Sequence, residues 1–312
     1  MIIWMAALCL PAAVRTAIPG QAALWDFASP EPLRCRVSGA ELRQGNDSQP
    51  VGIVYVNDIV PGSGPFGRAA AFGFDGHGQR LWAPREAVPR LAAISGPAAT
   101  VTVMAWVRLL PPPRNLHGGA LVGGVWEEDR SWRQYAIFMD GTGGCKARNG
   151  LVAHISGEGG PSPGQRYCES RACGATALAP GGWHCLANVY DGKKIQAFVN
   201  GTLDTSPDSG KPGLENPFQY PDPPRYPTGG IFTPPPGGGA NFSLGANYIH
   251  QGGGVGPGFL SNKFVGLLGA YTVFDRALEA AELRELCEGG PHANAPASPG
   301  CVSHSLFSEK RF

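Results

Sequence analysis

Charged residues are scarce in this chain of 312 residues. Only 16% of the side chains are charged, the formal net charge is +1, and no run of basic residues interrupts that balance. A surface of this kind produces no long-range field that would attract a polyanion. We therefore expect no nucleic-acid partner.

Long apolar runs are almost absent as well. After the first fourteen residues, no segment approaches the roughly 20 apolar residues of a membrane helix, so we expect no transmembrane segment in the mature chain. The apolar run over residues 1–14 has the length of a signal-peptide core, and small residues follow at Ala17, Ala22 and Ala23. We predict a signal peptide over residues 1–22 and a secreted or cell-surface protein, with a buried N-terminal strand as the alternative. Arg15 follows the apolar run instead of preceding it, which departs from the usual pattern.

Two recognisable catalytic motifs are also missing. The sequence contains no phosphate-binding loop and no His-Glu-x-x-His. Glycosidases use paired carboxylates, and Glu127 and Asp129 would share one face of an extended segment. However, Ser131 and Trp132 follow where a further acid is expected, which favours an acidic surface turn. We expect a binding protein more than an enzyme, and a glycoside hydrolase or polysaccharide lyase remains the alternative.

What the chain does contain is Gly (46), Pro (30) and 43% hydrophobic residues, which is typical of short strands joined by long loops. The run over residues 100–110 is apolar on both faces, so we place it in the middle of a sheet. The other strands are predicted over residues 23–27, 51–60, 119–126, 132–139, 242–246 and 264–274, and residues 68–74 lead into a predicted turn at residues 75–78.

The segment 183–204 predicts a β-meander. Asp191-Gly192 and Asn200-Gly201 tolerate the positive φ of tight hairpin turns, and each follows a short apolar run. Residues 205–240 are too rich in proline for central strands or helices and predict a long loop. Residues 277–286 predict the one helix. We expect a single domain over residues 23–288 and a flexible tail over residues 289–312.

Cysteine usage supports export. Cys9 lies in the predicted signal, and the mature cysteines are Cys35, Cys145, Cys168, Cys173, Cys185, Cys287 and Cys301. Their crowding between residues 145 and 185 predicts local disulfides, with a zinc site at Cys168 and Cys173 as the rival interpretation. Because seven is odd, one thiol is left over, and Cys301 is the candidate for a disulfide-linked dimer. Three glycosylation triplets begin at Asn46, Asn200 and Asn241.

Four segments in a fixed order resemble the laminin-G-like, concanavalin A-like lectin and glucanase family. They are residues 74–76, 101–107, 182–201 and 264–278. The resemblance implies an all-β fold, a jelly-roll sandwich of two antiparallel sheets with one short C-terminal helix and long Pro/Gly loops, in a subgroup whose function is undefined. Glu279 stands where that family often has a capping Ser, so either Asp275 caps the helix or its first turn frays.

The resemblance also implies where a ligand would bind, namely on loops and often beside calcium. Asp75, in a Gly-flanked turn, is the first candidate ligand for Ca²⁺, followed by Asp140 and Asp26. Aromatic side chains in loops or at strand ends are candidates for stacking on sugar rings, with structural packing as the alternative for each: Trp126, Trp132, Tyr135, Tyr167, Tyr248 and His250. The sequence thus predicts an extracellular recognition module for a glycan or glycoprotein, assisted by calcium. A structural cell-surface protein is the further alternative.

Overall fold

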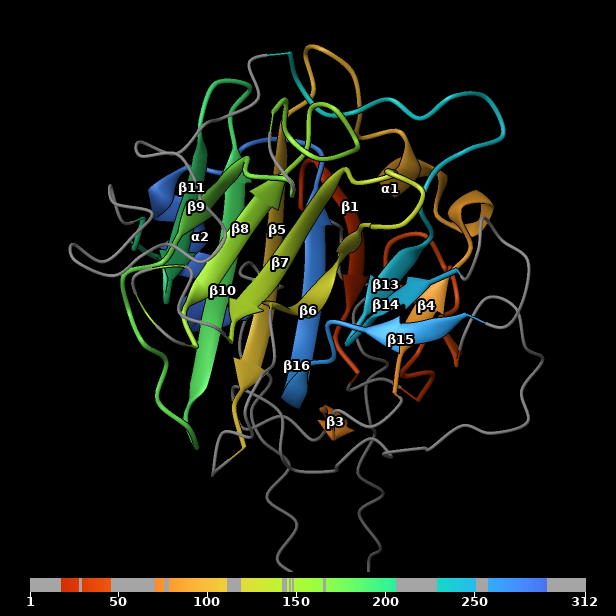
Figure 1. Ribbon diagram of the computed structural model, residues 1–312. Coiled ribbons are helices and arrows are strands. Elements are labelled where there is room, and N and C mark those ends of the chain that lie inside the picture. The colour runs from red at the N-terminus through yellow and green to blue at the C-terminus, as the bar shows by residue number, and fades with distance from the viewer. Residues whose placement is uncertain are drawn as a thin grey trace, which may run out of the picture.

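Two antiparallel sheets stack face to face (Figure 1). The computed structural model describes residues 18–27, 30–45, 71–75, 79–110, 119–141, 145, 147, 149–164, 167–205, 229–250 and 258–290. Within these residues each of the two sheets has seven strands, and a separate two-stranded hairpin pairs β14 (Asn247–Ile249) with β15 (Phe259–Ser261). The predicted all-β sandwich is confirmed.

We call the first sheet the helix-covered sheet. Its strands in spatial order are β1 (Gln21–Trp25), β16 (Val265–Phe274), β5 (Val101–Arg108), β10 (Trp183–Tyr190), β11 (Ile195–Val199) and β12 (Thr202–Leu203), with β3 (Phe72–Asp75) also paired to β16. As predicted, β5 lies in mid-sheet, between β16 and β10. The meander is also confirmed, because β10, β11 and β12 follow one another through the two expected turns.

The second sheet is the loop-covered sheet. Its strands in spatial order are β2 (Arg43–Gln44), β4 (Leu81–Ala83), β13 (Phe242–Leu244), β6 (Gly119–Val125), β7 (Tyr135–Asp140), β8 (Leu151–Ile155) and β9 (Arg171–Cys173). Close packing of β6 on β7 requires glycine at one point. A Cβ added to Gly124 would lie 2.3 Å from the Tyr135 carbonyl oxygen and 2.6 Å from the Ala136 Cβ.

The main core lies between the sheets, where alternate side chains of both sheets interdigitate. Trp25 stacks on Phe242 across this core, with ring centroids 4.8 Å apart. Asn188 adds a polar tie, since its amide nitrogen donates from β10 to the carbonyl oxygens of Ala136 (3.0 Å) and His154 (2.9 Å) on the other sheet.

The outer face of the helix-covered sheet is closed by α2 (Ala280–Gly289), drawn in blue in Figure 1. Leu283 and Leu286 of this helix belong to one buried cluster with Trp106 and Phe198. The helix begins later than predicted. Glu279 is its N-cap, and the Glu279 backbone N–H donates to the Glu282 carboxylate at 3.0 Å. Asp275 does not cap the helix, and its carboxylate instead accepts from Arg90 at 2.8 Å.

The outer face of the loop-covered sheet is closed by the chain around it. Trp126, which follows β6, packs on Phe138 and His154, and Cys145 and Cys168 join the same buried cluster. Two short helical segments that the sequence analysis missed, a 3-10 turn over Arg85–Ala87 and α1 (Pro89–Ala92), lie between β4 and β5.

The described residues contain two disulfides, of which one confirms the predicted local bridging and the other corrects it. Cys145–Cys173 is local, but Cys185–Cys287 joins β10 to α2 across 102 residues. The first bridge excludes a zinc pair at Cys168 and Cys173. Two described thiols, Cys35 and Cys168, are free and buried, whereas one leftover thiol was expected. Cys301 lies outside the described residues, and nothing in the described structure supports the predicted dimer.

Several other predictions fall outside the described residues: residues 1–17 of the predicted signal, the strand over 51–60, most of the loop over 205–240, and the tail from residue 291. The signal peptide therefore stays a prediction. Ala22 and Ala23 lie within β1, so a cut there would divide a strand. Within the described residues, no helix has the length and apolar character needed to cross a membrane.

Candidate functional site

The candidate site joins the loop over residues 126–134, between β6 and β7, to the end of β14. The loop turns sharply at residues 128–131, where Ser131 has a φ of +58°. Trp132 N donates back to the Glu127 carbonyl oxygen at 3.2 Å, which closes the turn. The His250 backbone N–H donates to the Asp129 carboxylate at 2.8 Å, which ties together two segments 121 residues apart.

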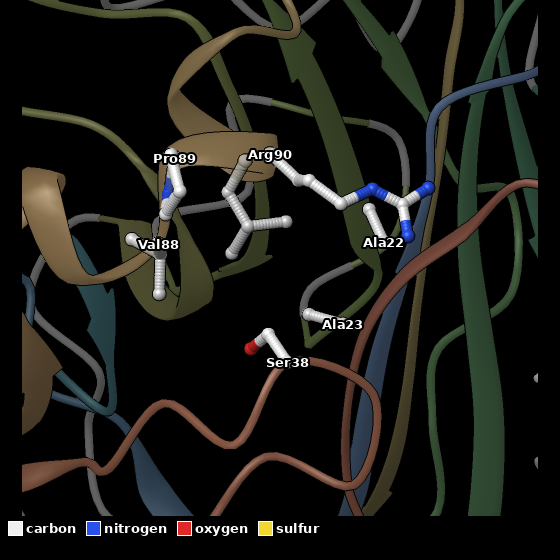
Figure 2. A pocket seen from close by; sticks show the side chains of 7 residues that line it. Ala22, Ala23, Ser38, Val88, Pro89 and Arg90 are labelled. Atoms are coloured by element: carbon white, nitrogen blue, oxygen red, sulfur yellow. The ribbon is translucent and has the colours of Figure 1, made fainter.

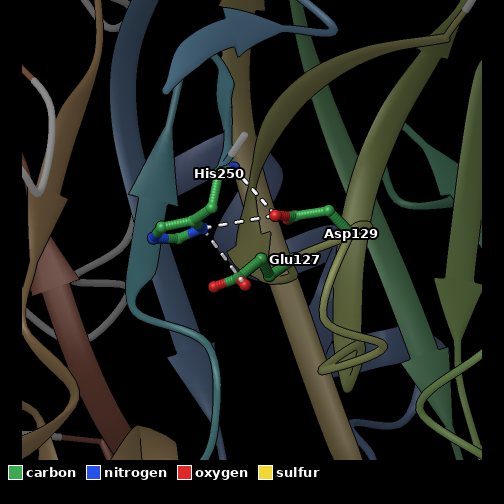
Figure 3. Close-up of side chains that lie close together, drawn as sticks. All are labelled: Glu127, Asp129 and His250. Atoms are coloured by element: carbon green, nitrogen blue, oxygen red, sulfur yellow. Dashed lines mark hydrogen bonds and ion pairs between the residues drawn. The ribbon is translucent and has the colours of Figure 1, made fainter. Parts of the chain in front are cut away.

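Three ligand-bearing side chains converge there (Figure 3). His250 Nδ1 lies 3.4 Å from Asp129 Oδ2 and 3.5 Å from Glu127 Oε1, and the three groups offer atoms that all lie within 4.8 Å of one another. We call this group the rim cluster. The His250 Nδ1 atom is buried and makes no hydrogen bond within the described residues. The Tyr248 ring meets the His250 ring edge-on, with centroids 4.7 Å apart, which orients the imidazole.

Charge within the rim cluster is partly neutralised by Arg130. Its guanidinium forms a two-pronged ion pair with Glu127, and the Arg130 Nη2 to Glu127 Oε2 distance is 2.7 Å. The Glu127 side chain is only 5% exposed, and burial raises the pKa of this carboxyl above its ordinary value against the opposing effect of Arg130. The Asp129 side chain is 20% exposed, so of the two carboxylates it is the one that faces solvent.

Glu128, which lies between Glu127 and Asp129 in the chain, stabilises the loop. Its carboxylate accepts from the Trp126 indole at 3.1 Å and from Arg133 at 3.2 Å, and so holds the base of the loop. The Arg130 guanidinium lies 4.0 Å from the centre of the Trp132 ring, a close cation–π contact. The loop is therefore held in one conformation by its own side chains.

The donor set suits a divalent cation in the spacing and the chemical type of its ligand atoms. Ligands placed tetrahedrally about 2.0–2.2 Å from a zinc ion lie about 3.3–3.6 Å from one another. The two distances from His250 Nδ1 fall in that range. An imidazole nitrogen beside two carboxylates suits zinc or manganese better than calcium, which prefers oxygen ligands alone. Arg130 competes for the Glu127 carboxylate, so a cation would have to share that ligand.

The structure brings together only some of the predicted aromatic residues. His250 lies in the rim cluster, and Trp132 is half-buried beside it under Arg130. Tyr135 has no exposed surface and donates to the Leu91 carbonyl oxygen at 2.9 Å, so its predicted contact with a ligand is wrong and its role is in the core. Tyr248 is buried and its hydroxyl accepts from Gly258 N at 2.9 Å.

Trp126 is buried on the outer face of the loop-covered sheet, so neither Trp126 nor Tyr248 offers an open face for a sugar ring. Tyr167 is half-buried in the segment before β9. Trp25 and Trp106 are buried.

The two predicted calcium ligands whose side chains the structure describes do not belong to one ligand cluster. The Asp140 carboxylate is buried and accepts from Cys145 N at 2.6 Å. Asp26 forms an ion pair with Arg36 at 3.3 Å. The Asp75 side chain lies outside the described residues. Among the described residues, the rim cluster is the one group of three ligand-type side chains close enough to share an ion. The sequence showed that Glu127 and Asp129 alternate, but no local signal linked them to His250.

A small cavity lies elsewhere, between β1 and α1 (Figure 2). Its volume is about 30 Å³, room for one or two water molecules, and Ala22, Ala23 and Leu91 are among the residues that line it. This cavity is too small for an organic ligand.

No protein-family model and no curated protein matches the sequence. Solved structures do match. The chain is similar to a mutant of HCR/D, with a TM-score of 0.52 and 9% identity over 86% of this chain and 52% of that one. These values show a shared fold. Domain 4 of AbnA, a GH43 extracellular arabinanase from Geobacillus stearothermophilus solved with arabinotriose, gives a TM-score of 0.49 at 17% identity over 86% and 98% of the two chains. Trypanosoma rangeli sialidase gives 0.47 at 12% identity over 89% and 34%.

The fold shared with HCR/D is the two-sheet sandwich described above, and membership of the jelly-roll family stays a prediction. The chain spans about half of HCR/D and about a third of the sialidase. At these identities the likeness concerns the fold, and the function has to be argued from the site.

Proposed function

We propose that this chain is an extracellular recognition module that binds a hydroxyl-rich ligand, a glycan or the glycan of a protein, at the rim cluster. The observation that carries the proposal is the convergence of Glu127, Asp129 and His250 from two distant segments. Carboxylates accept hydrogen bonds from sugar hydroxyls, and guanidinium and imidazole groups donate to them. The two disulfides support the proposed location, because such bridges persist in oxidising compartments.

The rim cluster suits binding because it is already held in place. Arg130, Glu128 and the Asp129–His250 hydrogen bond fix the loop before any ligand arrives. A loop fixed in this way loses little conformational entropy on binding. The more exposed Asp129 would accept from the ligand, while the buried Glu127 would orient His250 and Arg130.

We further propose that a divalent cation assists binding and that Glu127, Asp129 and His250 hold it, in place of the predicted Asp75, Asp140 and Asp26. When bound, such an ion supplies positive charge that sugar hydroxyl oxygens can coordinate. The ligand-type atoms within 4.8 Å of one another support this proposal, and the donor set favours zinc or manganese over calcium.

A glycan array in the presence of calcium, manganese or zinc, and again with chelator, tests the function. Asp129→Asn and His250→Gln should each weaken binding about tenfold or more, because each removes one polar partner of the ligand or ion. Asp275→Asn is the matched control, since Asp275 lies at the end of β16 on the other sheet.

The possible outcomes distinguish a wrong function from a wrong binding site. Absence of glycan binding at millimolar concentration, with every ion and with chelator, would overturn the proposed function. Binding that survives Asp129→Asn and His250→Gln at full strength would place the site elsewhere. Binding that is equal with and without chelator would remove the cation and leave the carboxylates as direct hydrogen-bond acceptors.

One observation favours a second function, a glycoside hydrolase. Glu127 combines a pKa raised by burial with a second carboxylate, Asp129, close by, which is the pairing of a general acid with a base or nucleophile. The ion pair with Arg130 opposes this function, because it lowers the pKa of Glu127 against the effect of burial. Incubation with polysaccharides and a reducing-end assay decides: released ends that vanish in Glu127→Gln would establish the hydrolase.

A further inference from the structure

Two glycosylation triplets lie in the described residues, and they differ in solvent exposure. They are Asn200-Gly201-Thr202 and Asn241-Phe242-Ser243. In sequence they are equivalent, because both carry the Asn and the hydroxyl that an N-glycan acceptor needs. Their surroundings decide which asparagine can carry a glycan in the folded protein.

Asn200 lies exposed in the tight turn between β11 and β12, with a φ of +50°. Its side-chain Oδ1 accepts from Cys185 N at 2.9 Å, whereas its Nδ2 makes no hydrogen bond within the described residues. An N-linked glycan attaches to Nδ2 and leaves Oδ1 as an acceptor. The modification therefore keeps the contact that fixes the turn.

The other two residues of this triplet also leave the acceptor accessible to solvent. Thr202 is exposed on β12, the edge strand of the helix-covered sheet. Gly201 is required between them, because a Cβ at this position would lie 2.6 Å from the Arg284 Cα, and its φ is +74°. The sequence Asn-Gly-Thr thus places acceptor and hydroxyl on the surface with no side chain between them.

Asn241 has the opposite surroundings. Its Oδ1 accepts from Arg85 N at 2.9 Å, and Phe242 follows in the core with no exposed surface. Ser243 is 1% exposed on β13, between β4 and β6, and its hydroxyl accepts from Arg80 Nη2 at 2.6 Å. The hydroxyl of this triplet is enclosed once the sheet forms.

We propose that Asn200 is an N-glycosylation site of this chain and that Asn241 is not. In the reaction, Asn200 Nδ2 forms a bond to the anomeric carbon of the first sugar, the bond from that carbon to the diphosphate of a lipid-linked oligosaccharide donor breaks, and Nδ2 loses one proton. The lipid diphosphate leaves. The inference rests on the proposed export of the chain and is independent of the ligand.

A glycan at this turn would also shield an edge. β12 ends the helix-covered sheet, and Leu203 beside the triplet is 53% exposed. Exposed edge strands with apolar side chains invite pairing with other chains, and a bulky hydrophilic group at the turn prevents that approach.

The test expresses the full chain behind a secretion leader in a eukaryotic host, with Asn46→Gln in every variant so that the third triplet is silent. Glycosidase release in heavy-oxygen water, followed by peptide mass mapping, marks each asparagine that carried a glycan. Thr202→Ala removes the hydroxyl at an exposed position, and Thr202→Ser is the matched control that keeps it. Ser243→Ala serves as the corresponding change at the enclosed triplet.

We expect the mass of one glycan on the parent chain, loss of that mass in Thr202→Ala, and its full return in Thr202→Ser. Ser243→Ala should leave the glycan mass unchanged. Label on Asn241 instead of Asn200, equal label on both, or an unmodified secreted chain would each overturn the proposal. Because the added leader supplies export, failure of the chain's own predicted signal cannot produce any of these results.

Discussion

The outer faces of the two sheets are closed in different ways. On the helix-covered sheet, α2 places Leu283 and Leu286 on Trp106 and Phe198, and Cys185–Cys287 fastens the helix to β10. On the loop-covered sheet, Trp126, Phe138 and His154 are covered by irregular chain, and polar groups such as Arg171 are buried with them. An amphipathic helix covers its sheet with apolar side chains. Irregular segments bury polar side chains as well, and the rim cluster forms beside the loop-covered sheet.

Truncation of one tryptophan on each outer face should show the largest difference. Trp106→Ala should lower the free energy of unfolding by about 4 kcal/mol, because α2 is tethered and cannot collapse onto the cavity. Trp126→Ala should lower it by about 3 kcal/mol, since loops can move into the space. Guanidinium denaturation of both variants measures this. A larger loss for Trp126→Ala would reverse the comparison.

Removal of the disulfides sharpens the same contrast. The Cys185–Cys287 bridge closes a loop of 102 residues and Cys145–Cys173 one of 28. In the chain-entropy model, loss of the longer bridge costs about 4.7 kcal/mol and loss of the shorter one about 3.6 kcal/mol, a difference of about 1 kcal/mol. Paired Cys→Ser variants under non-reducing thermal denaturation give both values. Equal losses would show that residual structure in the unfolded chain outweighs loop length.

The pH dependence of the free energy of unfolding should arise from a residue of the loop-covered sheet, His154. Burial, with help from Arg171 and Arg133, lowers the pKa of His154 from 6.5 to about 3. A neutral buried histidine gives stability that is fully present above the unfolded pKa and is lost as pH falls toward the folded one. Between pH 6.5 and 3 this residue alone should therefore remove about 1 kcal/mol per pH unit.

His154→Gln isolates that contribution. The slope of unfolding free energy against pH should become shallower than in the parent chain over the same interval, and the two should run parallel above it. Parallel slopes throughout would mean that His154 is hydrated in the native protein.

The smallest expected effect concerns the first turn of α2. Glu282 accepts from Glu279 N at 3.0 Å and from Arg276 at 2.6 Å, so Glu282→Ala should cost about 1 kcal/mol. Glu285→Ala, an exposed change in the same helix, is the control and should be neutral within about 0.5 kcal/mol. Equal thermal shifts for the two variants would show that Arg276 and the cap contribute nothing.

The helix-covered sheet could be predicted from the sequence. Its longest strands, β5, β10 and β16, are largely apolar runs, and Asp191-Gly192 and Asn200-Gly201 mark its turns by local conformational preference. The loop-covered sheet was harder. Three-residue strands such as β4 and β9 have no periodicity to detect, and their residues join the sheet only because neighbouring strands offer hydrogen bonds.

Local pattern by itself predicted a mid-sheet β5, a meander and a C-terminal helix, because alternation and turn chemistry act over a few residues. The sandwich of two sheets was implied by the family resemblance. Local pattern also showed Glu127 and Asp129 on one face. Tertiary structure alone decided that His250 meets them, that Tyr135 is core, and that Cys185 pairs with Cys287. These contacts join residues far apart in the chain, and their partners are fixed by how the sheets stack.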